Sequence, residues 1–197
     1  MWIRQTHPSP SSRSVAFDVD IGRRRIARNL AALGVLALTL GHGVTAAQSA
    51  PPGEARAPAL PATGTVLQLP DLTLFDGSIF GPRQAQGQVL VLYWWVSWCP
   101  FCALQSPEIQ RLWQTQKHKG LQLLTLSVDR KREDATAYLQ RKGFTFPAAL
   151  VTPDIARVLP KPKGLPVTVV RGRDGTVLQA ESGQLFPEDV EQLARWL

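Results

Sequence analysis

The chain has 197 residues, of which 44% are hydrophobic and 19% are charged, a balance typical of one globular domain that buries its own core without disulfide staples. Its two cysteines exclude a disulfide framework and a four-cysteine zinc site. Of the formal charge of +7, residues 1–47 carry +4 (6 Arg against 2 Asp), and the remaining +3 is spread over the rest of the chain, which excludes the electrostatic footprint of a nucleic-acid-binding protein.

Residues 1–47 have the order of a secretory signal peptide. A polar, basic stretch that ends in Arg23–Arg28 precedes the apolar run Leu30–Leu40, and small residues follow at Val44–Ala47. The arginine cluster also fits a twin-arginine signal, although a plain basic start is the simpler interpretation. An uncleaved membrane anchor is the alternative, but Gly41–Gly43 interrupts the run of about 20 apolar residues that a span needs. Either interpretation predicts export, to the periplasm or an equivalent compartment.

The residues that follow predict a linker and then a hairpin. Residues 48–62 are rich in Pro and Ala and hold few large apolar side chains, so we expect an extended linker there and a domain over 63–197. Val66–Leu74 alternates loosely between apolar and polar residues, and Asp76-Gly77 is a turn signal. Together they predict an N-terminal β-hairpin extension.

The middle of the chain predicts a β-α-β unit. Val89–Val96 is a continuous apolar run, as expected for a central strand that is covered on both faces. A helix should begin near Cys99, because Pro100 suits its first turn. Leu121–Val128 is a second apolar run, so we expect a parallel strand pair joined by a right-handed crossover.

The C-terminal part adds a helix, a hairpin and a last helix. Glu133–Lys142 has helical periodicity and stops at Gly143. Pro166–Arg171 and Thr176–Ala180 predict two antiparallel strands with a tight turn between them. Apolar residues at helical spacing then predict a helix over Pro187–Leu197. The predicted fold class is therefore α/β, with a central mixed sheet flanked by helices.

The chemistry of this chain lies in Cys99-Pro100-Phe101-Cys102. Two cysteines three positions apart at a helix start can close a small, reversible disulfide. Cys99 should lie at the N-cap, where the positive end of the helix favours a thiolate, and act as the nucleophile. Cys102 lies one turn further, more buried, and should resolve the mixed disulfide.

Three other interpretations of the cysteine pair carry less weight. Half of a metal site needs further ligands, and the only histidines are His7, His42 and His118, two of them in the leader. A purely structural disulfide would close too short a loop to constrain the unfolded chain. Two unrelated buried thiols are rare in an exported protein. We expect no metal and no cofactor.

Gly164-Leu165-Pro166 directly precedes an apolar strand. A proline can open a strand because its missing donor falls at the strand end. If the Leu165–Pro166 bond is cis, the loop could face Cys99 and pair with an extended substrate segment. A trans proline is the commoner form, and the residues alone leave both open.

The stretch from about Val66 to Leu197 resembles the thioredoxin-fold proteins of the TlpA/ResA type, which are membrane-tethered or periplasmic thiol–disulfide reductases. The pattern is specific for the fold and the redox pair, and much less so for the substrate. The matching pieces are the strand and cysteine motif at 89–102, Pro107, Leu-Ser-Val-Asp at 126–129, Phe-Pro-Ala-Ala-Leu at 146–150, Gly-Leu-Pro-Val-Thr-Val-Val at 164–170 and Asp-Gly-Thr-Val at 174–177.

The resemblance implies a thioredoxin-like fold with a central α/β insertion between about Leu126 and Gly164. It also implies that Cys99 attacks, that Cys102 resolves and that Pro166 is cis. The expected partners are protein disulfides and a membrane electron donor of the DsbD or CcdA kind, and we expect the domain to be a monomer.

Two positions depart from the family pattern. Such proteins often carry a glutamate three residues after the second cysteine, where this chain has Gln105. Thioredoxins proper carry a buried aspartate six residues before the first cysteine, where this chain has Tyr93. Neither side chain is a usual base for Cys102, so the proton could pass through water or through Glu108, which lies at a different helical angle.

The aromatic residues near the motif have different expected roles. Trp94 and Trp95 should pack in the core on opposite faces, whereas Trp98 should form an apolar rim for a substrate. The expected substrate-binding residues are Trp98, Pro100, Phe101, Leu165 and Pro166. The sequence thus favours a reductase of protein disulfides, with a DsbA-like oxidase or a non-catalytic thiol docking or metallochaperone module as alternatives.

Overall fold

The computed structural model describes residues 57–197. The predicted signal peptide and the first part of the predicted linker lie outside the described residues. The rest of that linker contacts the domain, because the Pro58 carbonyl accepts a hydrogen bond from the Lys163 amide at 2.8 Å and Leu60 packs against the core. No helix within residues 57–197 is long and apolar enough to cross a membrane.

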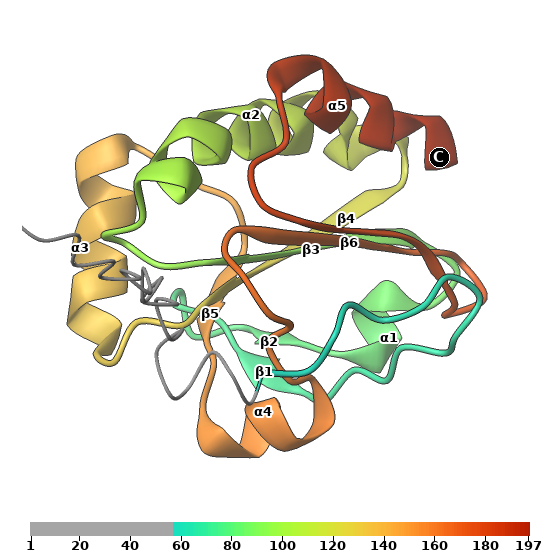
Figure 1. Ribbon diagram of the computed structural model, residues 1–197, viewed down its shortest axis with the longest axis horizontal. Coiled ribbons are helices and arrows are strands. Elements are labelled where there is room, and N and C mark those ends of the chain that lie inside the picture. Colours follow the sequence, from blue (N-terminus) through green and yellow to red (C-terminus); the bar gives the residue numbers. More distant parts are fainter. Residues whose placement is uncertain (1–56) are drawn as a thin grey trace, which may run out of the picture. The chain divides into compact units, whose positions relative to one another are not determined.

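A mixed five-stranded sheet forms the centre of the domain (Figure 1). The strand order is β5-β4-β3-β6-β7, in which β3, β4 and β5 are parallel and β6 runs antiparallel to both of its neighbours. The predicted parallel pair and the C-terminal hairpin are therefore confirmed. The strands are β3 (Val89–Trp95), β4 (Leu121–Ser127), β5 (Ala148–Leu150), β6 (Val167–Arg171) and β7 (Val177–Ser182).

Side chains of β3 alternate between two apolar layers, since successive residues of a strand point to opposite faces. Tyr93 and Trp95 lie in the layer formed with α2, α3 and α5, and Leu92 and Trp94 lie in the layer formed with α1, α4 and the N-terminal hairpin. Burial on both faces explains the continuous apolar run. The helices are α1 (Pro82–Ala85), α2 (Pro100–Gln116), α3 (Arg132–Lys142), α4 (Pro153–Val158) and α5 (Pro187–Gln192), with 3₁₀ turns at Lys117–Lys119 and Leu193–Trp196.

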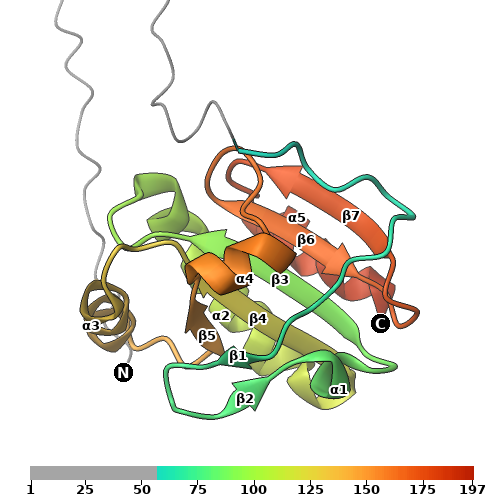
Figure 2. The ribbon, with the colours of Figure 1, turned by 90° about the horizontal axis from the view of Figure 1, so that it is seen from below.

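Two elements are shorter than their patterns predict. The N-terminal hairpin has only β1 (Leu72–Thr73) and β2 (Ile79–Phe80), because Pro70 cannot donate to a strand ladder. Figure 2 shows this hairpin on the β5 side of the sheet. The last helix changes to a 3₁₀ turn after Gln192, the tightening that helix ends often show.

Candidate active site

Cys99 caps the helix that follows the central strand. β3 ends at Trp95, a short loop follows, and α2 begins at Pro100 with Cys99 in extended conformation at its N-cap. The Cys99 sulfur accepts a hydrogen bond from the Cys102 amide at 3.4 Å. An N–H donor and the positive end of a 17-residue helix both favour negative charge on this sulfur.

The two cysteines differ in exposure. Both are free cysteines, and the side chain of Cys99 lies within hydrogen-bonding reach of Cys102. Cys99 is 8% exposed and Cys102 is fully buried. Burial, and then the neighbouring Cys99, raise the pKa of the Cys102 thiol far above its usual range, although the Val96 amide and the Tyr93 hydroxyl act in the opposite direction. Cys102 is therefore a protonated thiol at rest, and Cys99 is the sulfur that a substrate can reach.

The loop before β6 packs against the same apolar layer as the two cysteines. The Leu165–Pro166 peptide bond is cis, the form that the family resemblance implies. Leu165 packs against the apolar cluster that contains both cysteines. Pro166 is buried, and its carbonyl accepts a hydrogen bond from the Gly183 amide at 2.8 Å. The fold thus brings together two segments that lie more than 60 residues apart in the sequence.

Exposed apolar side chains, here called the apolar rim, lie at the start of α2. Trp98 and Phe101 are 77% and 56% exposed, and Pro100 between them is also exposed. Leu104, which the sequence analysis did not select, is 61% exposed. The sequence could have indicated this exposure, because residues three positions apart lie on the same face of a helix and Leu104 follows Phe101 by three positions. These exposed apolar side chains at the start of α2 are candidates for a contact surface.

A buried carboxylate anchors the loop that carries Cys99. Asp129, just past the end of β4, accepts hydrogen bonds from the Ser97 hydroxyl at 2.7 Å, the Ser97 amide at 3.1 Å and the Ser127 hydroxyl at 2.8 Å. The sequence analysis used Asp129 only as part of a family motif. Its partner Ser97 lies 32 residues away, and the parallel pairing of Trp95 with Ser127 brings the two strand ends together.

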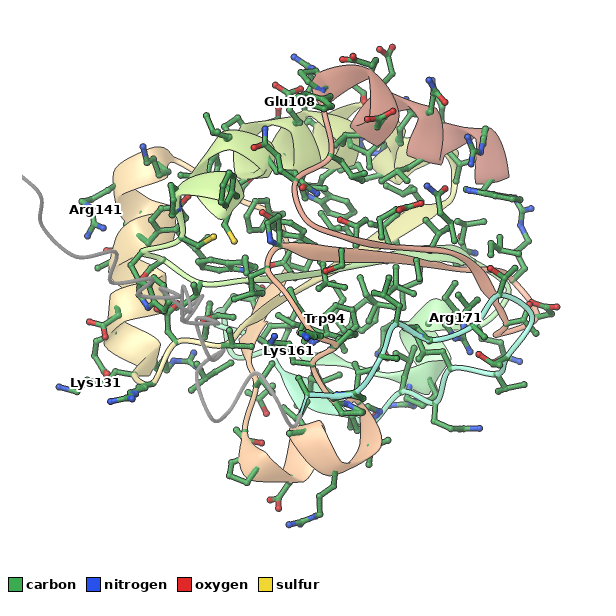
Figure 3. The ribbon with its side chains drawn as sticks, viewed as in Figure 1. Trp94, Glu108, Lys131, Arg141, Lys161 and Arg171 are labelled. Atoms are coloured by element: carbon green, nitrogen blue, oxygen red, sulfur yellow. The ribbon has the colours of Figure 1, made fainter. Side chains whose placement is uncertain are left out.

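The two positions that depart from the family pattern are buried and uncharged. Gln105 donates to the Thr168 hydroxyl at 2.9 Å and accepts from the Leu185 amide at 2.8 Å, so it ties α2 to β6 and to the loop before α5. Tyr93 is fully buried beneath α2, and burial raises its pKa well above the usual value. Glu108 pairs with Arg111 and lies beside α5, away from the sulfur atoms (Figure 3).

Metal ligands are sparse in this region. Within residues 57–197, no group of three or more His, Cys, Asp or Glu side chains is arranged to hold a metal ion. The site therefore consists of a dithiol, a cis-proline loop and an apolar rim. This arrangement is suited to thiol–disulfide exchange with an extended segment.

Several known proteins that are similar to this chain are named for thiol–disulfide chemistry. The thiol-disulfide oxidoreductase ResA of Geobacillus kaustophilus is 26% identical over 125 residues, which is 62% of this chain and 72% of that protein. ResA of Halalkalibacterium halodurans is 24% identical over 174 residues, 86% of this chain and 93% of that protein. A thiol:disulfide interchange protein of the thioredoxin family from Chlorobium tepidum superposes with a TM-score of 0.62 at 19% identity, over 68% of this chain and 97% of that one.

The superposition confirms the predicted thioredoxin-like fold, and the two ResA proteins agree with the resemblance found in the sequence. The AhpC/TSA family matches residues 67–178, which includes both cysteines and the cis-proline loop. The chain belongs to the AhpC/TSA family of thioredoxin-fold proteins.

Proposed function

We propose that this protein is a thiol–disulfide oxidoreductase that works outside the cytoplasm and reduces disulfides in other proteins. The observation that carries the proposal is the asymmetry of the dithiol. Cys99 lies at a helix N-terminus within reach of substrates, and the buried Cys102 stays protonated one turn behind it. An attacking sulfur followed by a resolving sulfur is the arrangement that stepwise exchange requires.

The reaction has two displacements. The Cys99 thiolate attacks one sulfur of the substrate disulfide, a bond forms between them, and the other substrate sulfur leaves as a thiolate. Cys102 then gives its proton to the surrounding water and attacks the Cys99 sulfur, the bond from Cys99 to the substrate breaks, and the second substrate sulfur leaves as a thiolate. The two cysteines lose two electrons and become a disulfide, and the substrate disulfide is reduced to two thiols.

Substrate contacts are proposed on both sides of Cys99. Trp98, Pro100 and Phe101 would receive apolar side chains beside the target disulfide, and the structure adds Leu104 to this surface. The backbone at Leu165 would pair with the extended substrate strand, a mode that accepts many sequences. Such a site suits a broad class of protein disulfides rather than one small molecule.

The cellular location of the protein and the reducing direction of its reaction are inferred from the N-terminal leader and from the relatives. The order of basic, apolar and small residues in 1–47 supports export, and relatives that carry the name ResA support disulfide chemistry. An oxidising compartment would leave the pair as a disulfide, so a reductase needs an electron source. A membrane dithiol protein of the DsbD or CcdA kind would supply the two electrons.

A trapping experiment tests the exchange activity. Cys102→Ser should accumulate mixed disulfides between Cys99 and substrate proteins, because nothing resolves them. The control is the double variant in which Cys99 is also Ser, which should trap nothing. Absence of Cys99-linked complexes from Cys102→Ser would refute exchange and favour a docking module.

A redox titration tests the direction. A reductase should have a potential near that of thioredoxin, about −270 mV, whereas a potential near that of DsbA, about −120 mV, would mean an oxidase. The exported protein should be found reduced in cells that hold the electron donor. A predominantly oxidised protein in those cells would contradict the proposed direction.

A further inference from the structure

The loop between α4 and β6, which carries Leu165, is anchored to neighbouring segments on both sides of that residue. Before it, the Lys163 amide donates to the Pro58 carbonyl at 2.8 Å, and the Ser182 hydroxyl donates to the Lys163 carbonyl at 2.8 Å. After it, the Pro166 carbonyl accepts a hydrogen bond from the residue that follows β7. The peptide unit that precedes Leu165 lies between these anchors.

The side chain of Lys161 holds this intervening part of the backbone. Its ammonium group donates to the Pro162 carbonyl at 2.7 Å and to the Gly164 carbonyl at 2.9 Å. Hydrogen bonds from a charged donor are roughly twice as strong as those between neutral groups. Gly164 has a φ of +90°, and a Cβ atom there would collide with the Ser182 hydroxyl, so the loop passes close to β7 at this point. Lys161 therefore fixes the backbone where glycine leaves it most freedom.

The bond to the Gly164 carbonyl also fixes the orientation of the Leu165 amide. The two groups belong to one planar trans peptide unit, in which C=O and N–H point in opposite directions. The Leu165 amide makes no hydrogen bond to any other group in residues 57–197. It is therefore open to the carbonyl of an extended substrate, and a cation on the Gly164 carbonyl polarises the peptide unit and strengthens this donor.

We propose that Lys161 is a positioning residue for substrate binding, because its ammonium group holds the Gly164–Leu165 peptide unit in the orientation that pairs with an extended polypeptide. This inference rests on the proposed exchange function. Lys161 acts through the loop and not on the reacting sulfur atoms. Its loss should therefore weaken the binding of polypeptide disulfides and leave the attack by Cys99 unchanged.

The neighbouring lysine provides a matched control. The side chain of Lys163 is exposed, and its ammonium group has no hydrogen-bond or ion-pair partner in the part of the chain that the structure describes. Lys161→Met and Lys163→Met remove the same charge from the same loop. A difference between them reports the two carbonyl bonds of Lys161 and not the local electric field.

Two disulfide probes with the same leaving group separate binding from chemistry. One is dithiodipyridine, a small neutral disulfide, and the other is an uncharged extended peptide whose single cysteine is joined to thiopyridine. Attack by Cys99 of the reduced protein on either probe forms a mixed disulfide and releases pyridinethione, which is followed by its absorbance. Saturation with peptide yields a half-saturating concentration and a limiting rate.

The two readouts should respond differently in the variants. Lys161→Met should raise the half-saturating peptide concentration about tenfold, the change expected when binding must also order about one backbone residue. The limiting rate with the peptide and the rate with dithiodipyridine should stay at the wild-type values. Lys163→Met should match the wild type with both probes.

Lys161→Gln takes the place of Lys161→Met if the latter does not fold, because its side chain is one bond shorter and carries no charge. The same pattern is expected. A wild-type half-saturating concentration in the folded variant, equal slowing with both probes, or an equal loss in Lys163→Met would overturn the proposal. A wild-type protein that reacts with dithiodipyridine no faster than a free cysteine would instead refute the exchange function on which it rests.

Discussion

The anchor of the Cys99 loop allows a quantitative prediction. In Asp129→Ala, the Ser97 amide, the Ser97 hydroxyl and the Ser127 hydroxyl all lose their acceptor. Ser127 is fully buried and Asp129 is 7% exposed, so water replaces these bonds only in part. At about 1–3 kcal/mol for a buried group left unsatisfied, and with Ser97 partly open to water, we expect the free energy of unfolding to fall by about 3 kcal/mol.

Urea unfolding measures this loss directly. With a slope of about 2 kcal/mol per molar urea, a loss of about 3 kcal/mol lowers the midpoint by about 1.5 M. Asp129→Asn keeps one acceptor oxygen and should recover part of the loss. Cys99 should also react more slowly with an alkylating reagent in Asp129→Ala, because the loop from Ser97 to Cys99 is no longer held against β4.

An exposed carboxylate provides the control. Asp134 lies in the first turn of α3, where the helix dipole gives it a small effect, so Asp134→Ala should cost less than about 1 kcal/mol. The reasoning is wrong if Asp129→Ala loses no more stability than Asp134→Ala, or if Cys99 reactivity stays the same after the midpoint has shifted.

Two further changes probe the buried surroundings of the site. Gln105→Ala removes the hydrogen bonds to Thr168 and Leu185 and should lower the free energy of unfolding, measured in urea, by about 2 kcal/mol. An unchanged urea midpoint would show that these two hydrogen bonds do not stabilise the fold. Folding raises the pKa of the Cys102 thiol. The protonated thiol therefore contributes its full share of stability below the unfolded pKa of about 8.5, and this contribution is lost as the pH rises from there toward the folded pKa. Above a pH of about 8.5, the free energy of unfolding of the reduced protein should therefore fall by up to about 1.4 kcal/mol per pH unit because of Cys102. Cys102→Ser should remove this contribution to the pH dependence. The same pH dependence in both proteins would contradict the raised pKa of Cys102.

The parts of the fold that the sequence predicts are those in which local pattern and burial agree. Val89–Trp95 lies at the centre of the sheet, so its apolar run has no polar interruption, and the break at Cys99 coincides with a helix cap. The β1–β2 hairpin is different. Each of its strands has two residues, and its place depends on contacts such as that between Leu74 and Ala149, which no local pattern encodes.

The candidate site shows the same division. The cysteine pair is local in sequence and was visible there. The roles of Asp129 and Gln105 depend on partners that lie 32 residues away in one case, and 63 and 80 residues away in the other. Both side chains could have been assigned from sequence only with the strand register in hand, because register decides which strand ends and helix faces meet.

The loss of charge around Cys102 has a consequence for when the second step can occur. A buried thiolate without a cation is costly, so Cys102 stays protonated until a base arrives and negative charge can be shared with a donor. In thioredoxins a carboxylate inside the protein can be that base before any substrate is bound. Here the two positions at which the family resemblance places a carboxylate hold Gln105, which bonds to Thr168, and Tyr93, which donates to the Cys102 carbonyl, and neither side chain accepts a proton near neutral pH. In the proposed exchange reaction, Cys102 therefore needs a base other than these two side chains, and the substrate thiolate released by the first attack is one such base.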